Sequence, residues 1–216
     1  VGTSLSIIVP TSIASVLTHK KHKSVDISII KTYGLFVILG VLAGTIFAAL
    51  IQTKSLVLFF SLVIYFLGTY LLLFQGKTKE TKKKFDFLSR LVFGFFSGFV
   101  SAAMGIAGAI INVCVLRYFG YPIKKAIGSA AAIGFIIALF GTIGFLISGT
   151  FLEANLPLSI GFINIPAFLI FIPITTFMAR VGANTVYKID KSKVQALFGI
   201  FLYVVGTVFI YRYLNL

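Results

Sequence analysis

The chain has 216 residues, of which 59% are hydrophobic and 11% charged, and its formal net charge is +14. Charged residues make up about 25% of an ordinary soluble domain. The low charged fraction, together with a mean hydropathy of +1.07, excludes that class. A strongly basic chain suggests nucleic acid as one partner. Here the basic residues lie between long apolar stretches, where the positive-inside rule accounts for them, so we expect no nucleic-acid partner.

The apolar stretches predict membrane-spanning helices, each of which needs about 20 mostly apolar residues. In chain order we expect them at Tyr33–Ile51, Ser55–Phe74, Leu91–Leu116, Ala126–Ser148 and Leu156–Ala179, with marginal candidates at Val1–Thr18 and Val194–Tyr211. The runs are nearly continuous rather than alternating, which argues against a β-barrel. The expected fold class is all-α, a polytopic helical membrane protein without a soluble domain.

The positions of Lys and Arg choose between two topologies. If the segment Leu91–Leu116 crosses the membrane once, eleven basic residues face the cytoplasm and eight face outside, which is almost no bias. If this segment enters and returns on one side, seventeen are cytoplasmic and only Lys54 and Arg212 are outside. The positive-inside rule prefers the second arrangement.

The segment Leu91–Leu116 also has the composition of a broken helix. Gly94, Gly98, Gly105 and Gly108 interrupt it, and Asn112 is one of its polar members. Non-helical backbone at membrane depth requires surrounding protein or a water-filled cavity. We therefore expect a re-entrant hairpin here, the alternative being a glycine-rich helix packed closely on its neighbours.

Short sequence similarities indicate an internal repeat. The start of the chain, Val1-Gly2-Thr3-Ser4, resembles residues 127–130 at an offset of 126, while Gly44 matches Gly182 and Gly68 matches Gly206 at an offset of 138. Matched loops carry opposite charge, because the loop His19–Lys31 is basic whereas Gly149–Asn155 holds only Glu153. Opposite bias at matched positions predicts inverted halves, a recurring plan of secondary transporters.

The repeat divides the chain into three parts. Residues 1–74 form the first repeat, residues 75–90 a basic cytoplasmic linker, and residues 91–216 a second repeat of one hairpin and three spans. The first repeat shows three spans only, so its N-terminal hairpin is expected to precede Val1 or to be missing.

Several short motifs resemble those of a known family, and the resemblance extends over nearly the whole chain in hydropathy and order. Residues Met104–Ala109, then Asn112–Leu116, then Lys125–Ser129 resemble the repeat signature of the TauE/SafE family of sulfite and sulfonate exporters, and Val1–Leu5 is similar to its last element. Ala107 and Ala109 stand where the family signature has glycine, and Cys114 stands where it has proline. The resemblance implies export of a small sulfur-containing or organic anion across the inner membrane of a bacterium.

The candidate site lies at the tip of the expected hairpin. Helix N-termini attract anions, and glycine lets an oxyanion approach the backbone. The candidate substrate-binding residues supply glycine, hydroxyl or amide groups: Thr3, Ser4, Ser101, Gly105, Gly108, Asn112, Gly128 and Ser129. We expect a small anionic substrate, contact with membrane lipid, and no metal or cofactor.

Three alternatives remain beside export. Uptake of an anion by the same fold is open, because the sequence does not set the direction of transport. A non-transporting membrane subunit would not need broken helices. A membrane enzyme is not expected, because all five acidic residues lie in loops or at their edges and both histidines lie in one loop. Small-residue spacings such as Gly40–Gly44 serve packing within or between chains, so a homo-oligomer also remains open.

Overall fold

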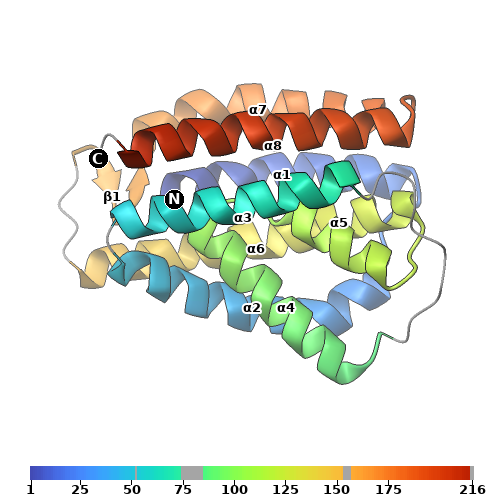
Figure 1. The fold of residues 1–216 in the computed structure, drawn as a ribbon. Helices are drawn as coiled ribbons and strands as arrows, with labels where there is room; N and C mark the ends of the chain where they lie inside the picture. The colour runs from blue at the N-terminus through green and yellow to red at the C-terminus, as the bar shows by residue number, and fades with distance from the viewer. Residues whose placement is uncertain (52, 74–84, 153–156, 215–216) are drawn as a thin grey trace.

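The computed structural model describes residues 1–51, 53–73, 85–152 and 157–214, and within them it is almost entirely helical (Figure 1). Eight helices are described: α1 Gly2–Lys21, α2 Ile27–Leu50, α3 Thr53–Leu73, α4 Phe87–Met104, α5 Ala109–Tyr118, α6 Ile123–Phe151, α7 Ile165–Thr185 and α8 Lys191–Leu214. Two short antiparallel strands, β1 Ser159–Ile160 and β2 Ile163–Asn164, join α6 to α7. Most of the predicted linker 75–90 lies outside the described residues.

Four of these helices are long and apolar enough to cross a membrane: α2, α4, α7 and, within α6, Lys124–Phe151. Helices α3 and α8 contain shorter apolar stretches, Val57–Thr69 and Gly199–Tyr211. A helix satisfies its own backbone hydrogen bonds, which lipid cannot do. Helices are therefore the segments that cross a bilayer. The protein is an all-α, multi-pass membrane protein, as predicted.

Helix α1 packs on both α6 and α7 within the bundle of Figure 1. Helix α6 packs on α1, α2 and α5, and α2 also packs along α4. Helix α7 lies beside α1, while α3 and α8 form an antiparallel pair joined by hydrogen bonds of Tyr65 with Thr207 (2.8 Å) and of Thr69 with Tyr203 (2.6 Å). Helices α1 and α6 are antiparallel, because Leu5 meets Gly141 whereas Ser24 meets Gly128.

Four connections meet at one end of the molecule. The Asp26 N–H donates to Ser129 Oγ (3.0 Å), His19 Nδ1 lies 2.7 Å from the Tyr187 hydroxyl, and the rings of Phe85 and Phe119 are 4.3 Å apart. We call this the basic end, because the described basic residues on these connections and adjoining helix turns lie there: Lys20, Lys21, Lys23, Lys31, Arg90, Arg117, Lys124, Lys125, Arg180, Lys188, Lys191 and Lys193. Lys54, in the first turn of α3, and Arg212, in the last turn of α8, lie at the other end. This is the charge distribution that the second topology predicts.

The expected boundaries of two spans were wrong. Helix α7 begins at Ile165 rather than Leu156, because the strands form a tight turn in which Gly161 adopts a φ of +56° and Asn164 Oδ1 accepts the Ala167 N–H (3.0 Å). Helix α2 begins at Ile27 rather than Tyr33, since Asp26 Oδ1 accepts the Ser28 N–H (3.0 Å). Caps of this kind, rather than the ends of apolar runs, set where these helices start.

Glycines bring α2 and α4 into backbone contact. A Cβ at Gly40 or Gly44 of α2 would collide with the carbonyl oxygens of Phe95 and Phe99, and a Cβ at Gly98 of α4 would collide with that of Val37. Small residues allow such close approach between membrane helices, where van der Waals packing replaces the hydrophobic effect. The repeat counterpart of Gly44 on α7, Gly182, has nothing within 4 Å, so the matching face of α7 is open in the described structure.

We predict that Gly98→Ala destabilises the protein whereas Gly182→Ala does not. Overpacking of a tight contact costs about 1–3 kcal/mol, while alanine at an open helical position gains up to about 1 kcal/mol over glycine. Thermal unfolding in detergent, followed by circular dichroism and by labelling of Cys114 with a thiol-reactive dye, measures both. Equal midpoints for the two variants would show that α2 and α4 are not in close contact.

Candidate functional site

The predicted broken segment consists of two helices separated by a four-residue turn. Helix α4 ends at Met104 and α5 starts at Ala109, and the capping residues Gly105 and Gly108 adopt left-handed conformations with φ of +68° and +60°. Residues with a Cβ rarely adopt this conformation, so glycine at both positions permits the chain to reverse. The glycine pattern of the sequence thus predicted the interruption correctly.

Contacts between α4 and α5 show that α5 runs back toward the end of the molecule at which α4 starts. Ser101 of α4 lies against Gly108 at the tip, Ser97 is hydrogen-bonded to Asn112 farther along, and the ring of Phe93 is 5.5 Å from that of Phe119 near the basic end. Successive contacts therefore join earlier residues of α4 to later residues of α5. The α4–α5 hairpin starts and ends at the basic end (Figure 1).

The fully buried side chain of Asn112 bridges the two helices of this hairpin. Its Oδ1 accepts the Ser97 hydroxyl of α4 (2.8 Å) and lies 3.0 Å from the Tyr33 hydroxyl of α2, while its Nδ2 donates to the Gly108 carbonyl (2.8 Å). The Tyr33 hydroxyl is also 3.1 Å from the Phe93 carbonyl, so its one proton has two acceptors within reach. Because every polar atom of the amide has a partner inside the protein, the role that the structure supports for Asn112 is to brace the hairpin.

The tip of the hairpin carries hydrogen-bond donors without acceptors. The Ser101 hydroxyl is fully buried, points at Gly108 and has no hydrogen-bond partner. It adjoins the N-terminus of α5, whose first N–H groups have no acceptor within the helix, and the N-cap Gly108 provides no side chain for them. A buried donor without a partner costs about 1–3 kcal/mol, which an acceptor bound at the tip would recover.

The first turn of α1 contacts the same tip. Ser4 Oγ donates to the Gly105 carbonyl (2.8 Å), and Val1 lies against Gly105. From the other side, the Ala107 carbonyl approaches Gly134 of α6. The tip therefore lies between the start of α1 and the middle of α6, with one of its faces close to the exposed Ser4.

Thr3, Gly128 and Ser129 occupy two other places, and those places match each other. Thr3 Oγ1 accepts the N–H of Asn164, the residue that caps α7, at 2.9 Å, and Ser129 Oγ accepts the N–H of Asp26, the residue that caps α2, at 3.0 Å. A Cβ at Gly2 would meet the Phe162 carbonyl at 2.7 Å, and one at Gly128 would collide with that of Ser24. Each pair obeys the offsets of 126 and 138, so both halves of the molecule contain the same contact.

Of the eight candidate residues, four meet at the hairpin tip: Ser4, Ser101, Gly105 and Gly108. Asn112 lies one helical turn beyond, whereas Ser129 is five residues before Gly134 on α6, about 8 Å along the helix axis from the level of the tip. Sequence reasoning missed Tyr33, which contacts the hairpin from α2. Nothing near Tyr33 in the sequence signals that contact, because it depends on how α2 packs against α4.

The described residues contain no group of three or more His, Cys, Asp and Glu side chains that could hold a metal ion. The tip itself offers hydroxyl, backbone N–H and apolar groups and no carboxylate. Such a set of donors suits an acceptor-rich, negatively charged molecule rather than a cation.

We predict that Asn112→Ala lowers stability far more than Ser61→Ala. The asparagine change removes the acceptor of the Ser97 and Tyr33 hydroxyls and creates a cavity, at a cost of about 2–4 kcal/mol, while the Gly108 carbonyl keeps the backbone N–H of residue 112 (2.9 Å). Ser61 is equally buried, but its hydroxyl bonds only to the Val57 carbonyl of its own helix. Thermal unfolding in detergent compares the two, and similar midpoints would show that Asn112 does not brace the hairpin.

Comparisons with known proteins agree with this architecture. Residues 1–209 match the sequence model of a family described as Sulfite exporter TauE/SafE. A probable membrane transporter protein of Haemophilus influenzae is 29% identical over 205 residues, covering 95% of this chain and 78% of that protein.

Two further relatives carry the same description. A probable membrane transporter protein of Methanocaldococcus jannaschii is 24% identical, covering 95% of this chain and 76% of the relative, and the probable membrane transporter protein YunE of Bacillus subtilis is 23% identical, covering 98% and 80%. No solved structure matches the chain significantly. Because the family match extends over almost the whole sequence, the chain belongs to the TauE/SafE family of membrane transporters.

Proposed function

We propose that this transporter carries a small oxyanion, sulfite or a sulfonate, and that the anion binds at the tip of the α4–α5 hairpin. The observation that supports this most directly is the Ser101 hydroxyl, a fully buried donor without a partner beside the N-terminus of α5. A helix N-terminus carries about half a positive charge, which favours an anion at this position. Gly105 and Gly108 leave room for oxygen atoms to approach the backbone.

The distribution of charge supports an anion as the substrate. Asp26, Asp86 and Asp190, the acidic residues that the structure describes, lie outside the four helices that are long enough to span a membrane. Proton-coupled carriers often place a carboxylate within a span. We therefore propose transport without a carboxylate proton relay.

We further propose that the basic end faces the cytoplasm of a bacterial cell and that net transport is outward across the inner membrane. The positive-inside rule supports this orientation. An inside-negative potential favours export of an anion by about 2.3 kcal/mol per charge for each 100 mV. Uptake remains the alternative, since the direction follows the combined gradients of substrate and potential.

We predict that Ser101→Ala weakens sulfite transport. The variant removes one hydrogen bond to a charged ligand, worth about 1.5–3 kcal/mol, so half-saturation should rise roughly 10- to 100-fold. Uptake of radiolabelled sulfite into proteoliposomes measures this, with a potassium–valinomycin potential of either sign to test charge movement. Ser61→Ala, another fully buried serine, is the control and should transport normally.

The outcomes separate the site from the substrate. A loss in Ser101→Ala alone, with flux that follows the imposed potential, supports both parts of the proposal. Equal effects of the two serine changes would contradict the site. If the folded wild type moves no sulfite, sulfite is not the substrate, and sulfonates and carboxylates are tested in the same way. Flux that follows an imposed pH gradient but ignores the potential would contradict transport without a proton relay.

A further inference from the structure

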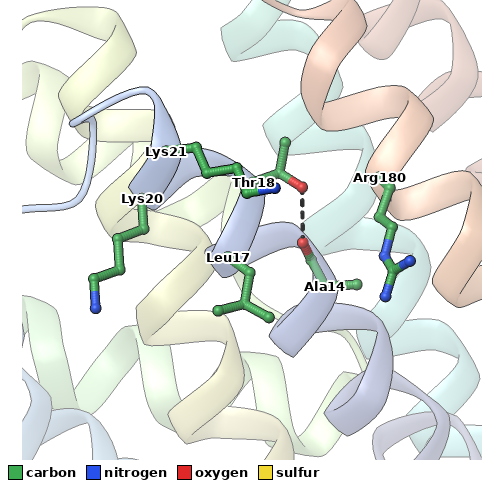
Figure 2. A pocket seen from close by; sticks show the side chains of 6 residues that line it. All are labelled: Ala14, Leu17, Thr18, Lys20, Lys21 and Arg180. Atoms are coloured by element: carbon green, nitrogen blue, oxygen red, sulfur yellow. Dashed lines mark hydrogen bonds between the residues drawn. The ribbon is translucent and has the colours of Figure 1, made fainter.

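A second place with the chemistry to bind an anion lies far from the hairpin tip, in an open hollow between the ends of α1 and α7 (Figure 2). Its volume is about 570 Å³, and its lining consists of Ala14, Leu17, Thr18, Lys20, Lys21 and Arg180. We call this hollow the α1–α7 groove. Three of its six lining residues are cationic, and none is acidic.

The groove carries three cations, two from α1 and one from α7. Within the described residues, none of Lys20, Lys21 and Arg180 forms an ion pair. The Thr18 hydroxyl donates its proton to the Ala14 carbonyl (2.9 Å), so within the groove this hydroxyl can only accept a hydrogen bond. The groove thus carries cations from two helices at the basic end, and we infer that this end lies at the headgroups of one leaflet.

Exposed apolar side chains adjoin the cations along both helices. Ile13 and Leu17 lie one turn apart on α1, and Phe177 precedes Arg180 by one turn on α7; all three hydrophobic side chains are exposed. An apolar surface that adjoins cations fits an amphiphile better than a free ion. The cations would contact the headgroup and the apolar strip would contact the acyl chain.

The internal repeat provides a comparison within the same molecule. By the offsets of 126 and 138, Leu17, Lys20, Lys21 and Arg180 correspond to Ile143, Leu146, Ile147 and Leu42 on α6 and α2. Leu42, Ile143 and Ile147 are also exposed, so the matching surface at the opposite end is apolar throughout. The fold alone therefore does not require cations at these positions.

We propose that the α1–α7 groove binds the phosphate headgroup of an anionic phospholipid of the leaflet at the basic end. Basic pockets between membrane helices are suited to such headgroups, and each Lys or Arg near the membrane surface contributes about 1 kcal/mol, or roughly fivefold in affinity. The lipid would join α1 to α7, two helices of different repeats. This proposal does not depend on the identity of the transported substrate.

The test uses the purified protein in a neutral detergent with dioleoylphosphatidylglycerol, dioleoylphosphatidylcholine or inorganic phosphate added. We expect phosphatidylglycerol to raise the unfolding midpoint and to remain bound in native mass spectrometry, and we expect the other two additives to have little effect. The variant Lys20→Gln/Lys21→Gln/Arg180→Gln should lose at least about tenfold in phosphatidylglycerol affinity. Arg180→Lys keeps the charge and should retain most of the binding.

The matched control is Lys125→Gln/Lys188→Gln/Lys193→Gln, which removes three exposed basic residues at the same end but outside the groove. An equal loss in this control would overturn the proposal, because it would show a diffuse effect of surface charge. Equal stabilisation by inorganic phosphate would overturn it as well, in favour of a free anion. Retained phosphatidylglycerol binding by the groove variant would do the same.

Discussion

The architecture of this transporter depends on one buried amide. Asn112 joins α5 to Ser97 of α4 and to Tyr33 of α2, and it bonds the Gly108 carbonyl at the turn between the two halves of the hairpin. A helix broken inside a membrane leaves backbone groups that lipid cannot satisfy. By fixing the turn, the amide allows α5 to start in the interior and keeps the Ser101 hydroxyl and the α5 N-terminus next to each other.

The internal repeat explains how the two ends of the bundle are held. In each half a glycine lets a helix approach the loop that precedes a long helix of the other half. The residue after that glycine, Thr3 or Ser129, accepts the N–H of the residue that caps this long helix. The same short sequence therefore does the same structural work at both ends, in opposite directions. The halves differ in charge, because the basic residues are concentrated at one end. A scaffold with matched contacts and unmatched charge suits a carrier that must orient in a membrane and still expose its site from two sides.

The sequence predicted the features that follow from composition and missed those that follow from packing. Apolar length predicted the helical class, and the glycines at 105 and 108 predicted the interruption, because only a few residues tolerate a positive φ. The sequence does not distinguish Thr3 and Ser129 from the hydroxyls at the hairpin tip, because a hydroxyl beside a glycine at a helix start has the same local sequence whether it accepts a backbone N–H or donates to a ligand. The partners that distinguish these roles, Asn164 and Asp26, are more than a hundred residues away.

We infer that the α4–α5 hairpin enters and leaves on one side of the membrane, and cysteine labelling tests this most directly. Because Cys114 is the single cysteine of the chain, single cysteines can be introduced into a Cys114→Ala background at Lys21, Lys54 and Lys125 and labelled in intact cells with an impermeant maleimide. With a hairpin of this kind and a cytoplasmic basic end, the cysteines at 21 and 125 should both be protected until the cells are permeabilised, whereas the one at 54 should react at once. Labelling of the cysteine at 125 together with the one at 54 would show instead that the segment crosses the membrane and that no re-entrant hairpin is present.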